Sequence, residues 1–257
     1  MADILLDKNG FIATVTLSNP GKRNALDATM WRVLAQTFNQ LSQDENLRCV
    51  ILRGAGGHFA SGADIEEFPR VRNDLKSAKR YHMGLIAGAL EAISGCLHPT
   101  IAAIEGVCVG GGLELACACD IRIASPSARF GVPINRLGFP LAPIELRAML
   151  HLLGKAATLE ILLEGRLFDA AEAKEKGLLN RVAEDLWAEV QQTAERIAQG
   201  APLAARTTKQ LVRRLSPAAA PLSEQDINQA FAFLGTQDYQ EGVLAFLEKR
   251  PPVFRGK

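Results

Sequence analysis

One carboxylate is conspicuous in this sequence because its surroundings are almost entirely apolar. Glu114 follows three consecutive glycines, Gly110, Gly111 and Gly112, and the rest of residues 107–118 are small or apolar. A helix that begins after such a turn presents free N–H donors and the positive end of its dipole, which suit an oxygen whose negative charge grows during a reaction. A buried carboxylate is costly unless it has a partner or a task. We therefore interpret Glu114 as an acid/base residue rather than as a charge that only favours the start of a helix.

A second segment of small residues, 59–65, follows a glycine-rich turn at 54–58. Small side chains let the backbone approach a ligand closely, and exposed N–H groups there can bind an anion or a thioester oxygen. By itself the segment is equally compatible with a surface turn. The glycines at 110–112 are not followed by the Lys-Ser/Thr of a P-loop and do not form a Gly-x-Gly-x-x-Gly fingerprint, so a nucleotide site is disfavoured.

The elements that must position these residues alternate between strands and helices. Asn9-Gly10 predicts a hairpin turn between two short strands, and Asp27 is a good N-cap for a helix to about residue 42. Further along the chain, apolar runs predict strands at 49–53, 100–104 and 121–124 and a long helix over 75–94. Repeated strand–turn–strand–helix units of similar length predict a layered α/β fold.

Beyond about residue 140 the pattern is mostly helical. Candidate helices cover 144–153, 155–163, 170–176, 184–199, 202–214, 222–234 and 237–248. Gly200-Ala201-Pro202 is a boundary signal, so we expect a core with the active site over 1–199 and a helical region over 200–257. The helical region is Ala-rich and small, and we expect it to pack on the core or on another subunit.

Composition excludes several classes of protein. The chain has 257 residues, 48% of them hydrophobic, and a formal net charge of +1, which gives no electrostatic footprint for nucleic acid or a lipid surface. Its N-terminus lacks a basic leader, and no apolar run is long enough to cross a membrane. The five cysteines are odd in number, and Cys117 and Cys119 have no further ligand at metal-site spacing. We expect buried, reduced thiols in a cytoplasmic protein and no metal site.

Several motifs in order resemble the crotonase superfamily, also called the enoyl-CoA hydratase/isomerase family. The resemblance covers essentially the whole chain and rests on residues 19–26, 59–65, 98–106, 110–114, 119–124, 128–133 and 240–254. It implies an α/β fold that is a spiral of ββα units with a C-terminal helical oligomerisation region. It also implies a homotrimer or a dimer of trimers.

The same resemblance implies how the site works. The N–H groups of Ala63 and Gly111 would hold the thioester oxygen of an acyl-CoA, and Glu114 would move protons. No metal or separate cofactor would be needed, because coenzyme A is part of the substrate. The implied substrate and CoA contacts are Lys22, Arg23, Ala25, Ala60, Ser61, Gly62, Asp64, Ile65, Gly110, Ile134 and Lys249, the last of which would come from the same or a neighbouring subunit. Asp64 would fix its loop, and Tyr81 and His82 lie in a helix that could cover the acyl pocket.

The sequence departs from the family pattern at one position that matters for chemistry. The family's hydratases carry a second glutamate directly after the Phe-Gly-x-Pro segment, but here Phe130-Gly131-Val132-Pro133 is followed by Ile134. Glu145 lies eleven residues further on, near the start of the next helix, and is a candidate replacement or an ordinary first-turn charge. A hydratase needs two carboxylates to orient and activate one water, whereas double-bond isomerisation needs only one.

These observations leave a ranked set of functions. Enoyl-CoA hydratase is the leading hypothesis, and isomerisation of an enoyl-CoA by Glu114 alone is the alternative. Acyl-CoA decarboxylation, thioester hydrolysis and non-catalytic binding of a CoA ester remain open, because each can use the same oxyanion hole.

Overall fold

The chain opens with a β-hairpin that begins the main sheet. The computed structural model describes residues 2–216 and 223–256. Strands β1 (Asp3–Asn9) and β2 (Ile12–Ser18) pair antiparallel, and Gly10 has the positive φ that the predicted Asn-Gly turn requires. Alternate residues of β2 are buried, so one face of this edge of the sheet packs on the core.

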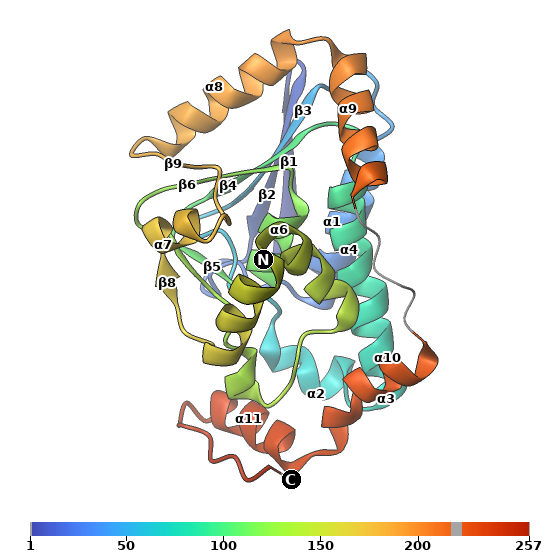
Figure 1. Cartoon of the computed structure of the whole chain (residues 1–257), viewed down its shortest axis with the longest axis vertical. Coiled ribbons are helices and arrows are strands. Elements are labelled where there is room, and N and C mark those ends of the chain that lie inside the picture. The colour runs from blue at the N-terminus through green and yellow to red at the C-terminus, as the bar shows by residue number, and fades with distance from the viewer. Residues whose placement is uncertain (1, 217–222, 257) are drawn as a thin grey trace.

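The other strands of the main sheet run parallel and are largely buried, except for the exposed two-residue strand at the far edge. β3 (Cys49–Gly54), β4 (Thr100–Ile104), β6 (Ile121–Ala124) and β9 (Arg181–Val182) follow β2 in that order. Helix α1 (Ala28–Leu41) begins at the predicted Asp27, whose side chain accepts from the Met30 amide. It lies beside α4 (Ala87–Gly95), whereas α8 (Leu186–Gln199) packs on β3 and β4 (Figure 1).

The helix predicted over 75–94 is present but is not uniform. It consists of α3 (Leu75–Lys79), a π-helical turn η2 (Arg80–Ile86) and α4. Asp74 caps α3 through the Ser77 amide. The wider π turn, a feature frequent at functional sites, has its consecutive residues Tyr81 and His82 both buried.

A small second sheet holds the start of the Glu114 helix. β5 (Val107–Val109) pairs parallel with β7 (Arg129–Gly131), which pairs antiparallel with β8 (Phe168–Asp169). Helix α5 (Gly111–Ala118) follows β5 and packs on α4 and on α6 (Pro143–Glu164). Non-helical backbone at Gly154 divides α6, in agreement with the two helices predicted there. The turn η3 (Pro133–Leu137) precedes α6.

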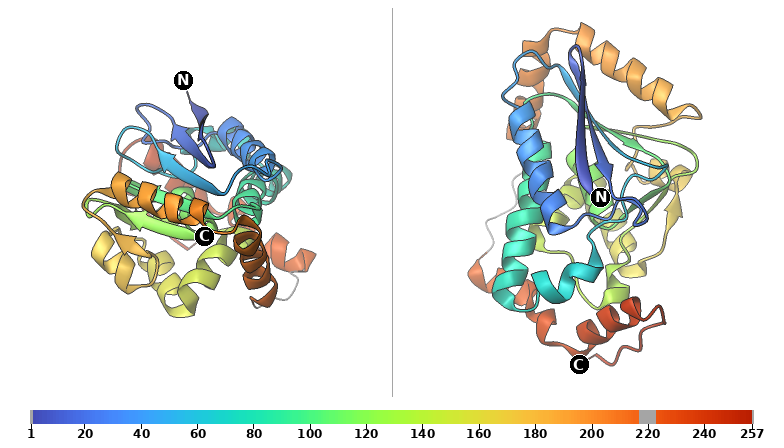
Figure 2. Two further views of the ribbon diagram at one scale, coloured as in Figure 1. Left: turned by 90° about the horizontal axis from the view of Figure 1, so that it is seen from above. Right: turned by 180° about the vertical axis from the view of Figure 1, so that it is seen from behind.

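The C-terminal helices pack on the rest of the chain at separate places. After α7 (Ala170–Glu175) and α8 come α9 (Pro202–Leu215), α10 (Glu224–Ala230), η4 (Ala232–Gly235) and α11 (Gln237–Leu247). In Figure 1, α8 and α11 lie at opposite ends of the long axis, and the right panel of Figure 2 shows the same arrangement from behind. The first residue of the helix predicted at 222–234 lies outside the described residues. Residues 1, 217–221 and 257 of the two predicted regions also lie outside them.

Hydrogen bonds and helix packing anchor the C-terminal helices on the core. Arg206 of α9 donates to the carbonyl oxygens of Glu45 and Leu47, and α11 packs on η3. The boundary predicted at 199/200 stays a prediction. In the part of the chain that the structure describes, no helix is both long and apolar enough to cross a membrane.

Candidate active site

A small cavity of about 80 Å³ brings together residues from five segments of the chain. Nine of the residues predicted from the sequence line it: Ser61, Gly62, Ala63, Ile65, Gly110, Gly111, Glu114, Ile134 and Glu145. The other lining residues are Phe68, Arg72, His82, Ile86, Val109, Pro133, Leu137, Phe139 and Leu141. The wall is therefore largely apolar, with a few ionisable side chains, which is the character of a site for a small organic group.

Two backbone amides on one side of the cavity are free to bind a ligand oxygen. Within residues 2–216 and 223–256, the N–H groups of Ala63 and Gly111 donate to no protein acceptor. Gly111 is the first residue of α5, where helix geometry leaves the amide without an internal acceptor. Two preorganised donors of this kind can stabilise a developing oxyanion.

Glycine geometry holds these amides close to each other. Gly62 has φ +97°, and a Cβ built on it would lie 3.0 Å from the Gly111 nitrogen and 3.0 Å from the Val109 oxygen. A Cβ at Gly112 would lie 2.3 Å from the Ala60 oxygen. The start of α5 therefore packs directly on the 60–63 loop, and side chains at these positions would force the two amides apart.

Backbone hydrogen bonds fix the 60–64 loop from both sides. The Ala60 amide donates to Val107 at 2.9 Å and its carbonyl accepts from Val109 at 3.0 Å, which joins the loop to β5. On the other side the Leu26 amide donates to Gly62 at 2.8 Å, and the Asp64 amide donates to Leu26 at 2.9 Å. The loop thus bridges the small sheet and the turn before α1.

That turn, residues 19–26, is held by two buried asparagines. The Asn24 side chain donates to the carbonyl oxygens of Ala55 and His58 at 2.8 Å and accepts from the Asn19 amide at 3.0 Å. Arg23 and Asn24 both have positive φ, near 50–60°. This conformation is uncommon outside glycine and asparagine, so the Asn24 hydrogen bonds stabilise an otherwise unfavourable backbone.

The turn and the loop carry most of the predicted CoA contacts and are joined by side-chain bonds. The Lys22 amine lies 2.7 Å from carboxylate oxygens of Asp64 and Glu66, and the Ser61 hydroxyl donates to the Lys22 carbonyl at 2.9 Å. Hydrogen bonds to these two carboxylates raise the pKa of Lys22. Arg23 is exposed, whereas Ala25 and Ala60 are buried and do not line the cavity.

Two of the predicted roles have different outcomes. Asp64 accepts from the Glu66 amide at 3.2 Å and so caps the turn η1 (Ile65–Glu67), as expected of a residue that fixes its loop. Lys249 is exposed after the end of α11 and does not line the cavity. Its predicted contact with CoA stays a prediction.

Glu114 is buried in the wall of the cavity and is 3% exposed. Its Oε2 atom has no hydrogen-bond partner among the described residues. Burial, with a smaller contribution from the charge of Glu145, raises the pKa of Glu114 well above its usual range. A carboxyl group in this condition retains its proton more readily than an exposed glutamate, which suits a role in proton transfer.

Glu145 projects into the same cavity, at the start of α6. It is 2% exposed, its Oε1 lies 2.6 Å from Nδ1 of His82, and its Oε2 accepts from the Ala142 amide at 3.2 Å. Burial raises the pKa of Glu145 to about 8. Burial also lowers the pKa of His82 well below its usual value, with a further contribution from the charge of Arg72. Both shifts favour the neutral forms of the two side chains, a carboxyl group and an imidazole joined by a hydrogen bond.

Arg72, the residue after α2 (Phe68–Val71), lines the cavity without having been singled out from the sequence. The local segment, Arg70-Val71-Arg72-Asn73-Asp74, is polar and resembles a solvated turn. Its burial depends on aromatic rings far away in the chain, of which Phe139 and Tyr239 are two. No local signal could have identified it.

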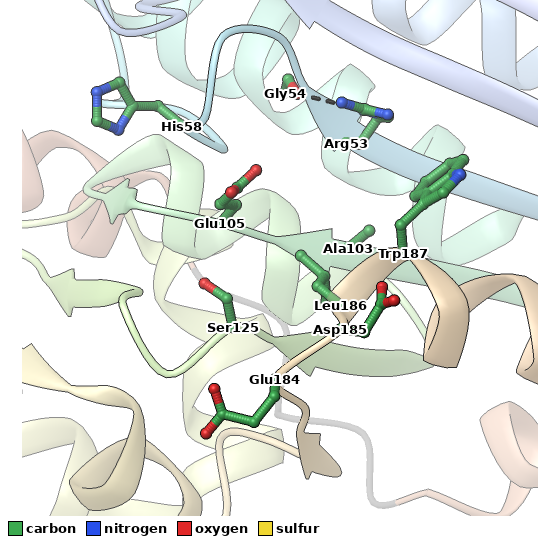
Figure 3. A pocket seen from close by; sticks show the side chains of 10 residues that line it. All are labelled: Arg53, Gly54, His58, Ala103, Glu105, Ser125, Glu184, Asp185, Leu186 and Trp187. Atoms are coloured by element: carbon green, nitrogen blue, oxygen red, sulfur yellow. Dashed lines mark hydrogen bonds between the residues drawn. The ribbon is translucent and has the colours of Figure 1, made fainter.

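A larger cavity of about 580 Å³ contains none of the predicted site residues. Figure 3 shows its lining, in which Glu105, Glu184 and Asp185 surround an opening beside Arg53 and Trp187. The Arg53 guanidinium lies 4.8 Å from the centre of the Trp187 ring. Among residues 2–216 and 223–256, no group of three or more His, Cys, Asp or Glu side chains is placed to hold a metal ion.

Comparison with known proteins agrees with this fold and site. Residues 7–257 match the enoyl-CoA hydratase/isomerase family. A protein of Mycobacterium bovis named probable enoyl-CoA hydratase is 36% identical over 98% of this chain and 97% of its own length. An enoyl-CoA hydratase/carnithine racemase from Magnetospirillum magneticum is 50% identical, with a TM-score of 0.82 over 100% of this chain and 97% of the other.

A third similar structure is methylmalonyl-CoA decarboxylase in complex with 2-nitronate-propionyl-CoA. It is 28% identical, with a TM-score of 0.88 over 99% of this chain and 98% of the other. The spiral α/β fold and the cavity define an enzyme of the crotonase superfamily. The chain belongs to the enoyl-CoA hydratase/isomerase family.

Proposed function

We propose that this enzyme adds water to the double bond of a 2-enoyl-CoA thioester. The observation that carries the proposal is that Glu114 and Glu145 line one cavity, beside the free amides of Ala63 and Gly111. Glu145 thus supplies the second carboxylate, which is missing at position 134, where this chain has an isoleucine. The names of the relatives from M. bovis and M. magneticum also favour hydration.

The chemistry assigns a role to each part of the cavity. The Ala63 and Gly111 amides donate to the thioester oxygen and stabilise the negative charge that it gains as the enolate forms. The water oxygen bonds to C3, one carboxylate takes the proton that this water loses, and a protonated carboxyl group delivers a proton to C2. The raised pKa values of both glutamates favour such an exchange, because burial makes each carboxyl group retain a proton more readily than an exposed glutamate does.

A second candidate, isomerisation of the double bond, rests on a specific contact. Both oxygens of Glu145 already accept or share hydrogen bonds, with His82 and the Ala142 amide, whereas Glu114 retains an unpartnered Oε2. If Glu145 only positions His82, Glu114 alone could move a proton between C2 and C4. The similarity to methylmalonyl-CoA decarboxylase keeps decarboxylation as an outcome of the test.

Turnover of two substrates distinguishes these functions. We expect the enzyme to convert crotonyl-CoA to 3-hydroxybutyryl-CoA, followed as loss of the conjugated enoyl-thioester absorbance and by mass spectrometry of the product. Conversion of 3-hexenoyl-CoA to 2-hexenoyl-CoA, with crotonyl-CoA unchanged, would replace hydration by isomerisation. Binding of both esters without turnover would leave decarboxylation, thioester hydrolysis and a non-catalytic role.

The remaining expectations from the sequence are part of the same proposal. We propose that coenzyme A is part of the thioester substrate and that the reaction needs no separate cofactor. The apolar side chains of α9 are exposed, Leu203 by 72% and Leu215 by 80%, which supports a homotrimer or dimer of trimers through the C-terminal region. All five cysteines are buried and unpaired, which favours the cytoplasm.

A further inference from the structure

The side chain of Arg72 is a buried cation that donates to no carbonyl or carboxylate oxygen of the described residues, and the Tyr239 side chain lies beside it. Arg72 is 1% exposed, and Nε, Nη1 and Nη2 have no partner among the described residues. Buried polar groups in native proteins nearly always have a partner, and a charged group without one is especially unfavourable. Because Arg72 lines the same cavity as Glu114, the missing partner can be a group of the substrate.

Another buried arginine of this chain shows what a structural role entails. Arg122 is 4% exposed, and its guanidinium donates to the carbonyl oxygens of Leu178 at 2.7 Å and Cys119 at 2.6 Å, with longer contacts to Ala116 and Asp120. Arg122 is thus fully bonded within the protein. Arg72 has the same burial and none of these bonds.

The surroundings of Arg72 stabilise its charge but leave its donors available. Its Cζ lies 4.1 Å from the centre of the Phe68 ring and 4.2 Å from that of Phe139, with Tyr239 at 5.2 Å and Phe233 at 5.4 Å. Aromatic faces attract the cation, whereas the N–H bonds point outward in the guanidinium plane. This arrangement orients the guanidinium and reserves its edge for an acceptor.

We propose that the acyl group of the substrate carries a second carboxylate, which binds the guanidinium of Arg72. This inference rests on the proposed function, in that the same cavity holds the acyl group. An anion is favoured over a neutral acceptor because it also compensates the buried charge, and a carboxylate matches the planar guanidinium with two parallel hydrogen bonds. The small volume of the cavity favours a short dicarboxylic acyl group, of about four to six carbons.

Binding of saturated esters tests this inference without any chemistry. Succinyl-, glutaryl- and adipyl-CoA are compared by calorimetry with butanoyl-, pentanoyl- and hexanoyl-CoA, which have the same chain lengths and no second carboxylate. We expect the best-fitting dicarboxylic ester to bind about 10- to 100-fold more tightly than its uncharged counterpart, the range expected for a charged hydrogen-bonded pair. Equal or weaker binding of the dicarboxylic ester at every chain length would overturn the proposal.

Variants of Arg72 identify the residue responsible. Arg72→Met should abolish the preference and leave the affinity for the uncharged esters within about threefold. Arg72→Lys, which keeps the charge but loses the paired donors, should retain part of the preference and provides the test if Arg72→Met does not fold. Arg70→Met is the matched control, because Arg70 lies on α2 with its side chain 73% exposed, and it should bind like the wild type.

The outcomes separate this inference from the proposed function. An equal loss of affinity for both kinds of ester in Arg72→Met would assign Arg72 a purely structural role and overturn the proposal. A preserved preference in an enzyme that does not hydrate crotonyl-CoA would support the carboxylate site and contradict only the hydratase. If the enzyme is a hydratase, the ratio of kcat/KM for hex-2-enedioyl-CoA to kcat/KM for hex-2-enoyl-CoA gives a second test. This ratio should fall in Arg72→Met by the same factor as the ratio of the affinities for adipyl-CoA and hexanoyl-CoA.

Discussion

The two sides of the cavity are built from different parts of the polypeptide. On one side the backbone amides of Ala63 and Gly111 are held by glycine contacts and by hydrogen bonds to β5. On the other side the side chains of Arg72, His82 and Glu145 enter from the residue after α2, from η2 and from α6. The backbone side is compatible with any acyl-CoA thioester, because it contacts only the oxygen that every such substrate has. The side-chain side can change without disturbing it and is therefore where the reaction and the substrate are selected.

The largest effect on activity should come from Glu114, which lines the same cavity as both sides. Glu114→Gln keeps the size of the side chain and removes its proton transfer, so hydration of crotonyl-CoA should fall by about 10²- to 10⁴-fold. Exchange of the α-protons of butanoyl-CoA in D₂O, followed by NMR, should fall as much. Glu175→Gln, a change at an exposed glutamate, is the control and should leave both rates unchanged. Full activity of Glu114→Gln would remove Glu114 from the mechanism.

A smaller but still large effect should follow a change on the backbone side. Gly62→Ala places a methyl group 3.0 Å from the Gly111 nitrogen at a φ that disfavours alanine. Displacing one oxyanion donor should lower kcat by about 10²- to 10³-fold for hydration and for α-proton exchange alike. Gly88→Ala, which meets no atom within 4 Å, is the matched control. A Gly62→Ala enzyme that loses only one of the two reactions would show that the amides do not serve every reaction in common.

The smallest expected effect is on stability and comes from the side-chain side. Burial raises the folded pKa of Glu145 above its unfolded value of 4.5, so its contribution to stability is present below pH 4.5 and is lost as the pH rises through about 8. The folded pKa of His82 is lowered, so its contribution to stability is lost as the pH falls. This loss occurs only below the unfolded pKa of 6.5. Between pH 6.5 and 8 the free energy of unfolding of the wild type should therefore decline, by at most about 1.4 kcal/mol per pH unit for this group.

Urea denaturation at several pH values measures this slope. In Glu145→Gln the decline between pH 6.5 and 8 should be smaller than in the wild type, because glutamine does not titrate, whereas Glu175→Gln should retain the wild-type slope. Equal slopes in all three proteins would show that Glu145 is ionised at neutral pH in the folded state. That result would contradict the raised pKa of Glu145.

Part of the backbone side could be predicted from local signals in the sequence, whereas the role of the Ala63 amide was expected only from the family resemblance. Three glycines before an apolar helix with one glutamate indicate a helix start, an amide site and a buried acid within a few residues. The main strands and helices were also predictable, since their hydrophobic patterns are long. The short strands β5, β7 and β8 have two or three residues each and carry no pattern of their own.

The side-chain side was only partly predictable because it forms by tertiary contact. Glu145 could be named as a candidate, but its place in the cavity depends on how α6 packs beside α5, and its partner His82 depends on the π turn of η2. Arg72 was missed altogether, since aromatic rings from residues 139, 233 and 239 bury it.

The central claim, that Glu145 turns a general enolate site into a hydratase, is tested most directly by Glu145→Gln. Hydration of crotonyl-CoA and α-proton exchange of butanoyl-CoA are measured in the same preparation. The account predicts that hydration falls by about 10²-fold or more while exchange, which needs only Glu114 and the two amides, stays within about tenfold of the wild type. Hydration within about threefold of the wild type would contradict it and would leave Glu114 as the only carboxylate that acts on the substrate.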